Sequence, residues 1–372
     1  MSTDAVGVQS LALSFPAVLR TNRYFQERQP ELVARAGEKS LARAFSTPPR
    51  PPGAAEDLWA RELRPYLGDP FRGTVERRVL GPGDSSLTLL HDAALAALGA
   101  AGHTPADIDL LLVSSLFPDQ PGPGDAAPLA ARLGLRCGAW NLEAMCVAPW
   151  IALETAAALI RAGTYRRILI ATSCTYSRSV EEDDTLAFFM GDGGAALLVA
   201  AATPGPTAPA QVLATKVLNT SDTIGVFYCE LLAGAPPRSV VRADAQAARR
   251  IPDTVTRYLV PACEAVLAAA GARLEDVDFF VFNTPTAWYE RVFAQALGVP
   301  LERTSNCYPR TANVGTVLPL ANLYWAAQAG LIRPGSLVLV FAMGYACNAV
   351  ATLLRWGTTA LAPEPPPPTQ IQ

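Results

Sequence analysis

The sequence predicts an α/β protein built from two related halves. Strand-like apolar runs, such as IDLLLVSS and RRILIATS, alternate with alanine-rich segments of helical length, a pattern typical of buried sheets covered by helices. The segment AALGAAGHTPADIDLLLVSS returns later as AVLAAAGARLEDVDFFVFNT, and this alignment pairs Gly102 with Gly271 and Asp109 with Asp278 without a gap. An internal repeat of this kind indicates two halves of similar structure.

Composition excludes several classes of protein. The 372 residues are 50% hydrophobic and 17% charged, enough for two domains, or one large domain of two halves, around an extensive core. A net charge of −3 without basic runs argues against nucleic-acid binding. No apolar run reaches the roughly 18 residues of a membrane span, and MSTDAVGVQS lacks the features of a signal peptide. We therefore expect a cytoplasmic protein that binds neither nucleic acid nor membrane.

The seven cysteines are widely spaced and include no CxxC pair. An odd number with this spacing argues against a disulfide framework and against a zinc site, so we expect no bound metal. Most free cysteines are small buried hydrophobic residues. A catalytic cysteine therefore needs a specific indication.

The repeat and the proline-rich stretches set the expected boundaries. We assign residues 1–204 to an N-terminal half and residues 205–358 to a C-terminal half. Residues 22–80 of the first half are polar and partly helical, include the proline-rich link 45–55, and are interpreted as a lid or an insertion. The proline-rich tail, residues 359–372, is predicted to be disordered or polyproline-like.

A second repeat indicates a functional site. The helical segments IALETAAALIRAG and LPLANLYWAAQAG match, and each leads into an apolar strand. Counting back 17 residues from Gly163 gives Cys146, and counting back 17 from Gly330 gives Asn313. The two residues are thus equivalent, each at the start of a helix. In a pseudo-twofold molecule these two helix starts could face each other near the axis.

The position of Cys146 favours a nucleophile. Unpaired backbone N–H groups and the positive end of the helix dipole both stabilise a thiolate, which is the reactive form. Pro149 falls within the first turn, where a missing N–H costs nothing. Simple packing under the helix is the usual role of such a cysteine, but the equivalence with Asn313 favours catalysis.

Several segments together resemble the β-ketoacyl-acyl-carrier-protein synthase III family, which has the thiolase fold. They occur in the family's order and spacing over nearly the whole chain: FPAVLRTN, GTVERRVL, NLEAMC, FMGDGGAALLVA, ANVGTVLPLANLYWAAQAGLIRPGSLVLVFAMG and ATLLRW. The resemblance implies a five-layered αβαβα fold with two pseudo-symmetric halves, and a homodimer. It also implies a substrate pocket that includes Phe188, Phe189 and Met190.

The resemblance further implies a ping-pong acyl transfer through Cys146. The acyl group would come from coenzyme A or an acyl carrier protein, as a thioester substrate, and no permanently bound cofactor is implied. The backbone N–H of Cys146 and one from the loop Gly344, Tyr345 and Ala346, assigned to Tyr345, would form the oxyanion hole. The family has glycines where Tyr345 and Ala346 stand, so the acyl pocket could be narrower or reshaped here.

The chain departs from the family at its catalytic histidine. Asn283, in VFNTPTAWYERV, stands at that position, and the two histidines of the sequence, His91 and His103, lie upstream of Cys146. Asn283 and Asn313 could still donate hydrogen bonds to a thioester or enolate oxygen. Neither amide accepts a proton at neutral pH, so general-base catalysis worth roughly 10²–10⁴-fold would be missing.

Side chains beside Asn283 could supply part of the missing function. We name Thr284, Thr286 and Glu290 as auxiliary candidates, although hydroxyls at helix starts mostly serve as caps. Glu143, three residues before Cys146, is a further carboxylate with a weaker indication.

Three functions remain open at this point. We favour an acyltransferase that passes an acyl group from Cys146 to a small-molecule or carrier-bound acceptor, in specialised metabolism of the polyketide type, by analogy with divergent family members. A decarboxylative β-ketoacyl synthase that holds the enolate with two asparagines is the second. The third is a non-catalytic or half-catalytic subunit of a heterodimer with a histidine-bearing homologue.

Overall fold

The computed structural model covers most of the chain. It describes residues 5–36, 57–181, 183–203, 205, 207–234, 238–244, 246–345 and 347–372. The proline-rich link at 45–55 and Ala346 of the loop discussed above lie outside the described residues. None of the helices in the described part of the chain has the length and hydropathy that a membrane span requires.

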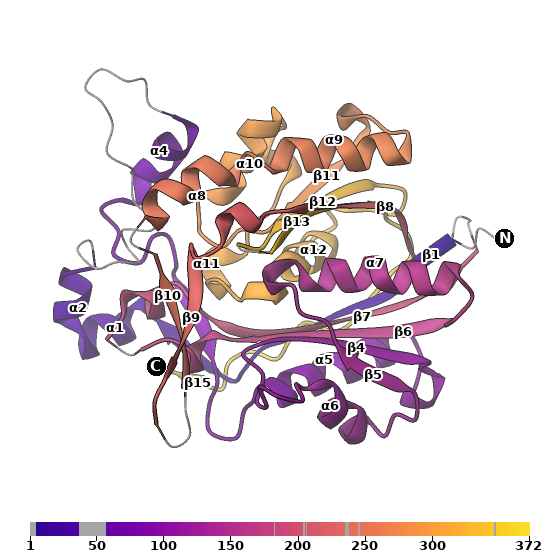
Figure 1. The fold of residues 1–372 in the computed structure, drawn as a ribbon, viewed down its shortest axis with the longest axis horizontal. Helices are drawn as coiled ribbons and strands as arrows, with labels where there is room; N and C mark the ends of the chain where they lie inside the picture. Colours follow the sequence, from indigo (N-terminus) through magenta and orange to yellow (C-terminus); the bar gives the residue numbers. More distant parts are fainter. Residues whose placement is uncertain are drawn as a thin grey trace.

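Ten strands of the described residues form one sheet that folds into two packed layers (Figure 1). Their order is β11-β12-β13-β8-β1-β7-β6-β4-β5, and β14 pairs with β1. The halves meet where β1 pairs with β8 at Gly7–Gln211 and Val8–Ala210. The bounds are β1 (Ala5–Ser14), β4 (Leu110–Leu116), β5 (Gly138–Asn141), β6 (Arg167–Thr175), β7 (Asp192–Ala202), β8 (Ala210–Asn219), β11 (Phe279–Phe282), β12 (Leu337–Met343), β13 (Asn348–Arg355) and β14 (Ala360–Leu361).

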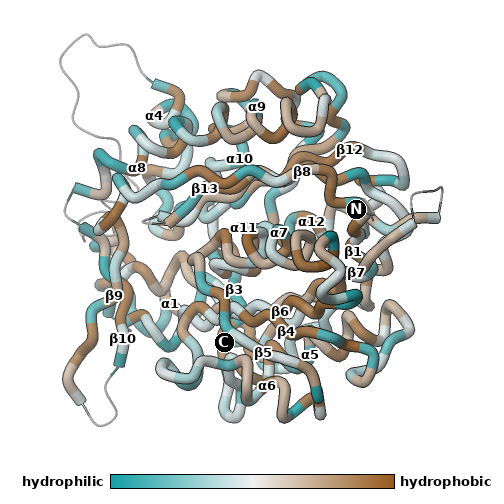
Figure 2. The backbone as a smooth tube through the Cα atoms, turned by 45° about the vertical axis from the view of Figure 1, so that its right-hand side comes forward, coloured by the Kyte–Doolittle hydropathy of each residue, from teal (hydrophilic) through white to brown (hydrophobic). Residues whose placement is uncertain are grey.

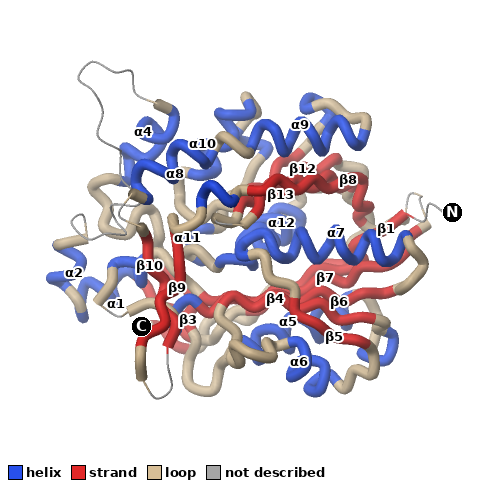
Figure 3. Tube along the Cα trace, in the orientation of Figure 1, coloured by secondary structure: helices blue, strands red, loops and turns tan. Residues whose placement is uncertain are grey.

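Helices complete a five-layered arrangement. Helices α7 and α12 lie between the two sheet layers, α5 and α6 cover one outer face, and α9 and α10 cover the other (Figure 3). This confirms the predicted αβαβα fold class. Their bounds are α5 (Ser86–Ala100), α6 (Ala126–Leu133), α7 (Ala148–Arg161), α9 (Leu259–Ala270), α10 (Tyr289–Leu297) and α12 (Leu318–Gln328).

The two central helices are largely apolar and largely buried because the two sheet layers cover them. Every residue of α12 from Leu318 to Tyr324 is buried, and eight of the fourteen residues of α7 are buried. A helix that is apolar all round belongs in a protein interior. Figure 2 shows the same distribution, with hydrophobic colour on the strands and around α12 and more hydrophilic colour on outer helices and loops.

The sequence repeat is also a structural repeat. The carboxylate of Asp109 accepts a hydrogen bond from the backbone N–H of Arg167 (2.9 Å), where β6 begins. In the second half, Asp278 accepts one from the backbone N–H of Leu337 (2.8 Å), where β12 begins. Each aspartate thus joins the start of one strand to the start of its parallel neighbour.

A small subdomain, made of β2 and the described residues of segment 22–80, lies at one end of the molecule (Figure 1). Strand β2 pairs with β3 and with the C-terminal β15, and Trp59 of α4 packs edge-on against Trp288 and Tyr289. A separate hairpin, β9–β10, precedes α8. The bounds are β2 (Val18–Thr21), α1 (Asn22–Arg28), α2 (Pro30–Ala34), α4 (Leu58–Leu63), β3 (Glu76–Val79), β9 (Phe227–Leu232), β10 (Arg238–Ala243), α8 (Ala247–Val255), α11 (Tyr308–Thr311) and β15 (Gln370–Ile371).

The prediction of a disordered tail at 359–372 is wrong. Strand β14 pairs with β1, and β15 pairs in parallel with β2. Proline has no backbone N–H, but its carbonyl still accepts hydrogen bonds. Accordingly, the guanidinium of Arg78 donates to the carbonyl of Pro366 (3.2 Å), and the backbone N–H of Thr21 donates to the carbonyl of Gln372 (3.1 Å).

Arg77 of β3 is a fully buried cation that joins the subdomain to the main body. Its guanidinium lies over the rings of Phe25 (4.9 Å) and Phe71 (5.9 Å). It donates to Asn22 Oδ1 (2.9 Å) and to the carbonyl of Phe188 (2.8 Å). Burial lowers the pKa of Arg77 to about 9. Neutral oxygens and aromatic faces therefore stabilise this charge.

We expect Arg77→Ala to lower the free energy of unfolding by about 3 kcal/mol, because it leaves a cavity and two buried oxygens without donors. The midpoint of urea denaturation measures the effect. Arg23→Ala is the control, since that side chain is 82% exposed and its removal should change stability by less than about 0.5 kcal/mol. Equal midpoints for the two variants would contradict the role given to Arg77.

Candidate active site

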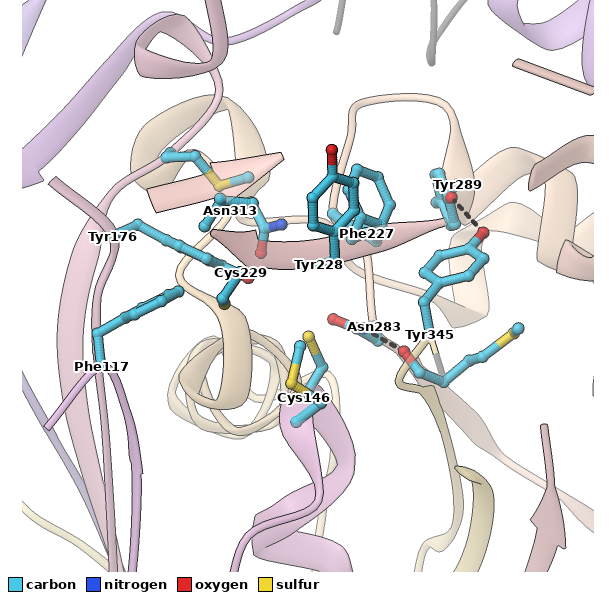
Figure 4. A pocket seen from close by; sticks show the side chains of 15 residues that line it. Phe117, Cys146, Tyr176, Phe227, Tyr228, Cys229, Asn283, Tyr289, Asn313 and Tyr345 are labelled. Carbon is cyan, nitrogen blue, oxygen red and sulfur yellow. Dashed lines mark hydrogen bonds between the residues drawn. The ribbon is translucent and has the colours of Figure 1, made fainter. Parts of the chain in front are cut away.

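A single pocket collects the sequence-predicted residues Cys146, Asn283 and Asn313 (Figure 4). It encloses about 700 Å³ of empty space, part of it open to solvent, and its walls are largely apolar. The lining residues are Phe117, Met145, Cys146, Tyr176, Met190, Phe227, Tyr228, Cys229, Val241, Asn283, Pro285, Tyr289, Asn313, Met343 and Tyr345.

Equivalent strained turns place Cys146 and Asn313. Met145 has φ 54°, Ala312 has φ 55°, and each directly precedes one of the two site residues. Positive φ costs energy for residues other than glycine, and such strain often accompanies functional sites. A short 3₁₀ turn and then a central helix follow in both halves. The equivalence deduced from spacing is therefore present in the backbone.

The environment of Cys146 differs from the sequence-based expectation of an activated thiol. Burial raises the pKa of Cys146 to about 11, because the apolar pocket removes the solvation that a thiolate needs. The helix start should favour the thiolate, but loss of solvation in an apolar pocket outweighs it. This environment raises the pKa of the Cys146 thiol, whereas the helix start alone would lower it.

The loop after β12 approaches the backbone of Cys146 closely. A side chain on Gly344 would lie 3.2 Å from Met145 Cβ and 3.5 Å from the backbone nitrogen of Cys146. The carbonyl of Gly344 accepts from Thr220 Oγ1 (3.2 Å), which fixes the loop. The backbone N–H groups of Cys146 and Tyr345 are therefore on neighbouring segments, as an oxyanion hole requires.

Asn313 is held so that its amide nitrogen can act as a donor. Its Oδ1 accepts from the backbone N–H of Gly315 (2.9 Å), and its own backbone N–H donates to the carbonyl of Phe189 (2.8 Å). The carbonyl of Asn313 accepts from Gly191 (3.0 Å). Because Oδ1 is engaged, Nδ2 is the group presented to the pocket (Figure 4).

Asn283 has the opposite orientation. Its Nδ2 donates to the carbonyl of Met343 (3.3 Å), while its buried Oδ1 has no hydrogen-bond partner within the described chain. Figure 4 shows Oδ1 on the side that faces Cys146. Asn283 thus offers the pocket an acceptor, whereas Asn313 offers a donor.

The auxiliary candidates do not line the pocket. Thr284 Oγ1 accepts from Asn322 (2.9 Å), and Glu290 accepts from Thr304 Oγ1 (2.6 Å). Thr286 is fully buried and is not among the lining residues, and its Oγ1 has no hydrogen-bond partner within the described chain. The idea that these side chains replace a catalytic histidine is corrected accordingly: Thr284 and Glu290 are engaged in hydrogen bonds within the fold, and none of the three residues lines the pocket.

Of the three residues predicted to form the substrate pocket, Phe188, Phe189 and Met190, one lines the pocket. Met190 lines the pocket, but Phe188 packs against Phe25 (4.8 Å) and Phe71 (5.1 Å), and Phe189 is buried. These two phenylalanines belong to the hydrophobic core and are not among the residues that line the pocket.

Two further side chains named from the sequence also lie elsewhere. His91 is on the outer helix α5, and Glu143 accepts from the backbone N–H of Ser115 (2.8 Å) rather than lining the pocket. Among the described residues, no group of three or more potential metal ligands is found.

Aromatic walls were missed by the sequence reasoning. Phe117 and Tyr176 directly follow β4 and β6, which are parallel neighbours, so their meeting at one sheet edge was available as a signal. Phe227 and Tyr228 come from the β9–β10 hairpin, whose position no local pattern specified. Tyr345 also contributes its ring, and its hydroxyl lies 3.2 Å from that of Tyr289.

Comparison with known proteins decides the family. The model described as 3-Oxoacyl-[acyl-carrier-protein (ACP)] synthase III matches residues 140–218, and the model of its C-terminal region matches residues 267–356. The β-ketoacyl-[acyl-carrier-protein] synthase III of Rhizobium meliloti is 32% identical over 288 residues, or 76% of this chain and 88% of that protein. The chain belongs to the 3-oxoacyl-[acyl-carrier-protein] synthase III family. The β-ketoacyl-[acyl-carrier-protein] synthase III 3 of Streptomyces coelicolor is 31% identical over 295 residues, which cover 76% of this chain and 87% of that protein.

Two solved structures share the fold of this chain. Synthase III from Pseudomonas aeruginosa gives a TM-score of 0.75 at 20% identity, covering 95% of this chain and 98% of that one. Cerulenin-bound OleA of Xanthomonas campestris gives a TM-score of 0.74 at 18% identity, and the match covers 94% of this chain and 97% of the OleA chain. The thiolase-like fold class is thereby confirmed.

We expect the alkylation rate of Cys146 by iodoacetamide to rise about tenfold per pH unit between pH 7 and 9. The thiolate is the reactive form, and its fraction grows with pH as long as pH stays below the pKa of about 11. Peptide mass spectrometry on wild type, with Cys146→Ala as background, measures the rate. A plateau below pH 8 would mean that the thiolate is already formed.

Proposed function

We propose that this protein is an acyltransferase that forms an acyl-Cys146 thioester and passes the acyl group to a small-molecule or carrier-bound acceptor. The donor is an acyl-coenzyme A or an acyl carrier protein thioester, and the setting is specialised metabolism of the polyketide type. The orientation of Asn283 is the observation that carries the proposal, because its unpartnered Oδ1 faces the nucleophile.

The first half-reaction exchanges one thioester for another. The sulfur of Cys146 attacks the thioester carbon, and the carbonyl oxygen becomes an oxyanion between the N–H groups of Cys146 and Tyr345. The carbon–sulfur bond to the donor then breaks, and the donor thiolate takes the proton lost by Cys146. In the second half-reaction an acceptor attacks the acyl carbon and Cys146 leaves, regaining a proton.

Decarboxylative condensation fits this pocket less well. The enolate formed when malonyl loses carbon dioxide needs hydrogen-bond donors at its oxygen. Asn313 supplies Nδ2, but Asn283 directs Nδ2 to Met343 and turns an acceptor toward the site. That acceptor suits the N–H or O–H of an incoming nucleophile. Among possible acceptors, an amine depends least on general-base catalysis, since it can attack the acyl carbon before it loses a proton.

We further propose a homodimer in the cytoplasm. Strand β5 is the last strand of the large sheet and carries the exposed Trp140. An edge strand with free backbone groups and an exposed aromatic side chain suits pairing with a second copy.

Intact-protein mass spectrometry with a panel of acyl-coenzyme A and acyl carrier protein thioesters tests the nucleophile. We expect wild type to gain the mass of one acyl group with at least one donor and Cys146→Ala to gain none. Cys229→Ala, which removes another pocket thiol, should behave as wild type. Acylation of Cys146→Ala, or no gain with any donor, would refute the acyltransferase and favour a partner subunit.

Carbon dioxide release from a malonyl thioester distinguishes transfer from condensation. We expect none from wild type and measurable release from Asn283→His, since an imidazole supplies the missing donor and base, worth roughly 10²–10⁴-fold. Asn283→Gln is the control for side-chain size and should release no carbon dioxide. Stoichiometric release by wild type would identify a condensing enzyme instead.

A further inference from the structure

One wall of the pocket is the ring of Tyr345, which is held at two places. The residue belongs to the loop after β12, and its side chain lines the pocket (Figure 4). Its hydroxyl lies 3.2 Å from the hydroxyl of Tyr289, the first residue of α10. Its ring packs edge-on against the ring of Phe227 in β9, at 5.5 Å. Because one contact comes from α10 and the other from the β9–β10 hairpin, the ring has little freedom to turn away from the pocket.

Buried aromatic rings support Tyr289 from behind. Tyr289 is 3% exposed, and its ring packs against Trp59 of α4 at 5.3 Å and against Phe293 of α10 at 5.5 Å. Trp59 and Phe293 are buried and are not among the residues that line the pocket. Because protein interiors are closely packed, Tyr289 cannot move back without displacing these rings. The subdomain that carries α4 therefore supports this wall of the pocket.

The pocket can discriminate between ligands by their shape rather than by their charge. None of the described residues that line it is an aspartate, glutamate, lysine, arginine or histidine. In an apolar pocket, one methylene group more or less changes the preference for a ligand by roughly 10- to 200-fold. The position of a rigid wall therefore decides which groups fit beside Cys146.

We propose that Tyr345 is a specificity-determining residue, whose ring, held by Tyr289 and Phe227, sets the largest group that Cys146 can carry. A group that extends from the sulfur toward α10 meets this ring, whereas a shorter group fits in front of it. The role proposed above for the backbone N–H of Tyr345 in the oxyanion hole is separate from this role of the ring. For acyl groups the inference rests on the acyl-Cys146 function, and for other groups on the sulfur it does not.

Alkylation of Cys146 with two reagents tests the wall without an acyl donor. Iodoacetamide and N-hexyl iodoacetamide share one reacting group and differ in length, so the ratio of their rates does not depend on the reactivity of the thiol. We expect wild type to react more slowly with the longer reagent. Tyr345→Ala removes the ring and should raise the ratio of the longer to the shorter reagent by about tenfold or more. Mass spectrometry of the Cys146 peptide measures both rates.

Tyr165→Ala is the matched control. Tyr165 is also partly buried and packs edge-on against one aromatic ring, that of Trp140 at 6.4 Å, but it is not among the residues that line the pocket. Its ratio should equal that of wild type. If Tyr345→Ala fails to fold, Tyr345→Leu fills more of the vacated space and should still raise the ratio. An unchanged ratio in the Tyr345 variants, or an equal rise in Tyr165→Ala, would overturn the proposal.

A series of acyl-coenzyme A donors of increasing chain length separates this inference from the proposed function. We expect Tyr345→Ala to form an acyl-enzyme with longer acyl groups than wild type does, as measured by intact-protein mass spectrometry. Absence of an acyl-enzyme with every donor would refute the proposed function, and the alkylation ratios would still decide the role of the ring. Acyl-enzymes of the same chain lengths in both proteins would refute the role of the ring and leave Cys146 as the nucleophile.

Discussion

The enclosure of α7 and α12 between two sheet layers is the constraint on which the rest of the molecule depends. A helix that is largely covered has little exposed surface on which to carry polar groups. The helix entries, where the backbone also has unpaired N–H groups, are the places where the polar side chains of the pocket lie. Cys146 and Asn313 occupy these two helix entries, each after a residue with positive φ. The five-layered fold thus fixes the position of the site at the two helix entries, and the residues at those entries then set its chemistry.

The same enclosure decides the electrostatics of the site. Aromatic rings and methionines surround the sulfur of Cys146, so the loss of solvation exceeds the contribution of the helix start. The polar groups that remain are neutral: backbone N–H groups, two amides and phenols. Such groups stabilise a developing charge without exchanging protons. A pocket of this composition suits the exchange of one thioester for another better than the removal of a proton from an acceptor.

Sequence periodicity and repetition were sufficient to predict an α/β protein of two related halves and the pairing of Cys146 with Asn313, because both depend on regular spacing within helices and strands. The five-layered arrangement was predicted from the family resemblance. The amide orientation of Asn283 was not accessible, since it follows from a hydrogen bond to Met343, a residue 60 positions away. The hydrogen bond between Glu290 and Thr304 was not accessible either, because the two residues belong to different segments of the chain. The tail was misjudged because its composition shows only that prolines lack a backbone N–H donor. It does not show that N–H groups elsewhere in the fold donate hydrogen bonds to the carbonyl groups of the tail.

The ordered tail has a consequence for how the protein is handled in the laboratory. Gln372 is held against Thr21, at the end of the molecule that carries β2 and α1, whereas the described chain begins at β1 on the opposite side (Figure 1). An affinity tag or a surface linker added after Gln372 would leave the molecule beside the subdomain that packs on Tyr289. Attachment at the amino end would leave the pairing of the tail with β2 unconstrained.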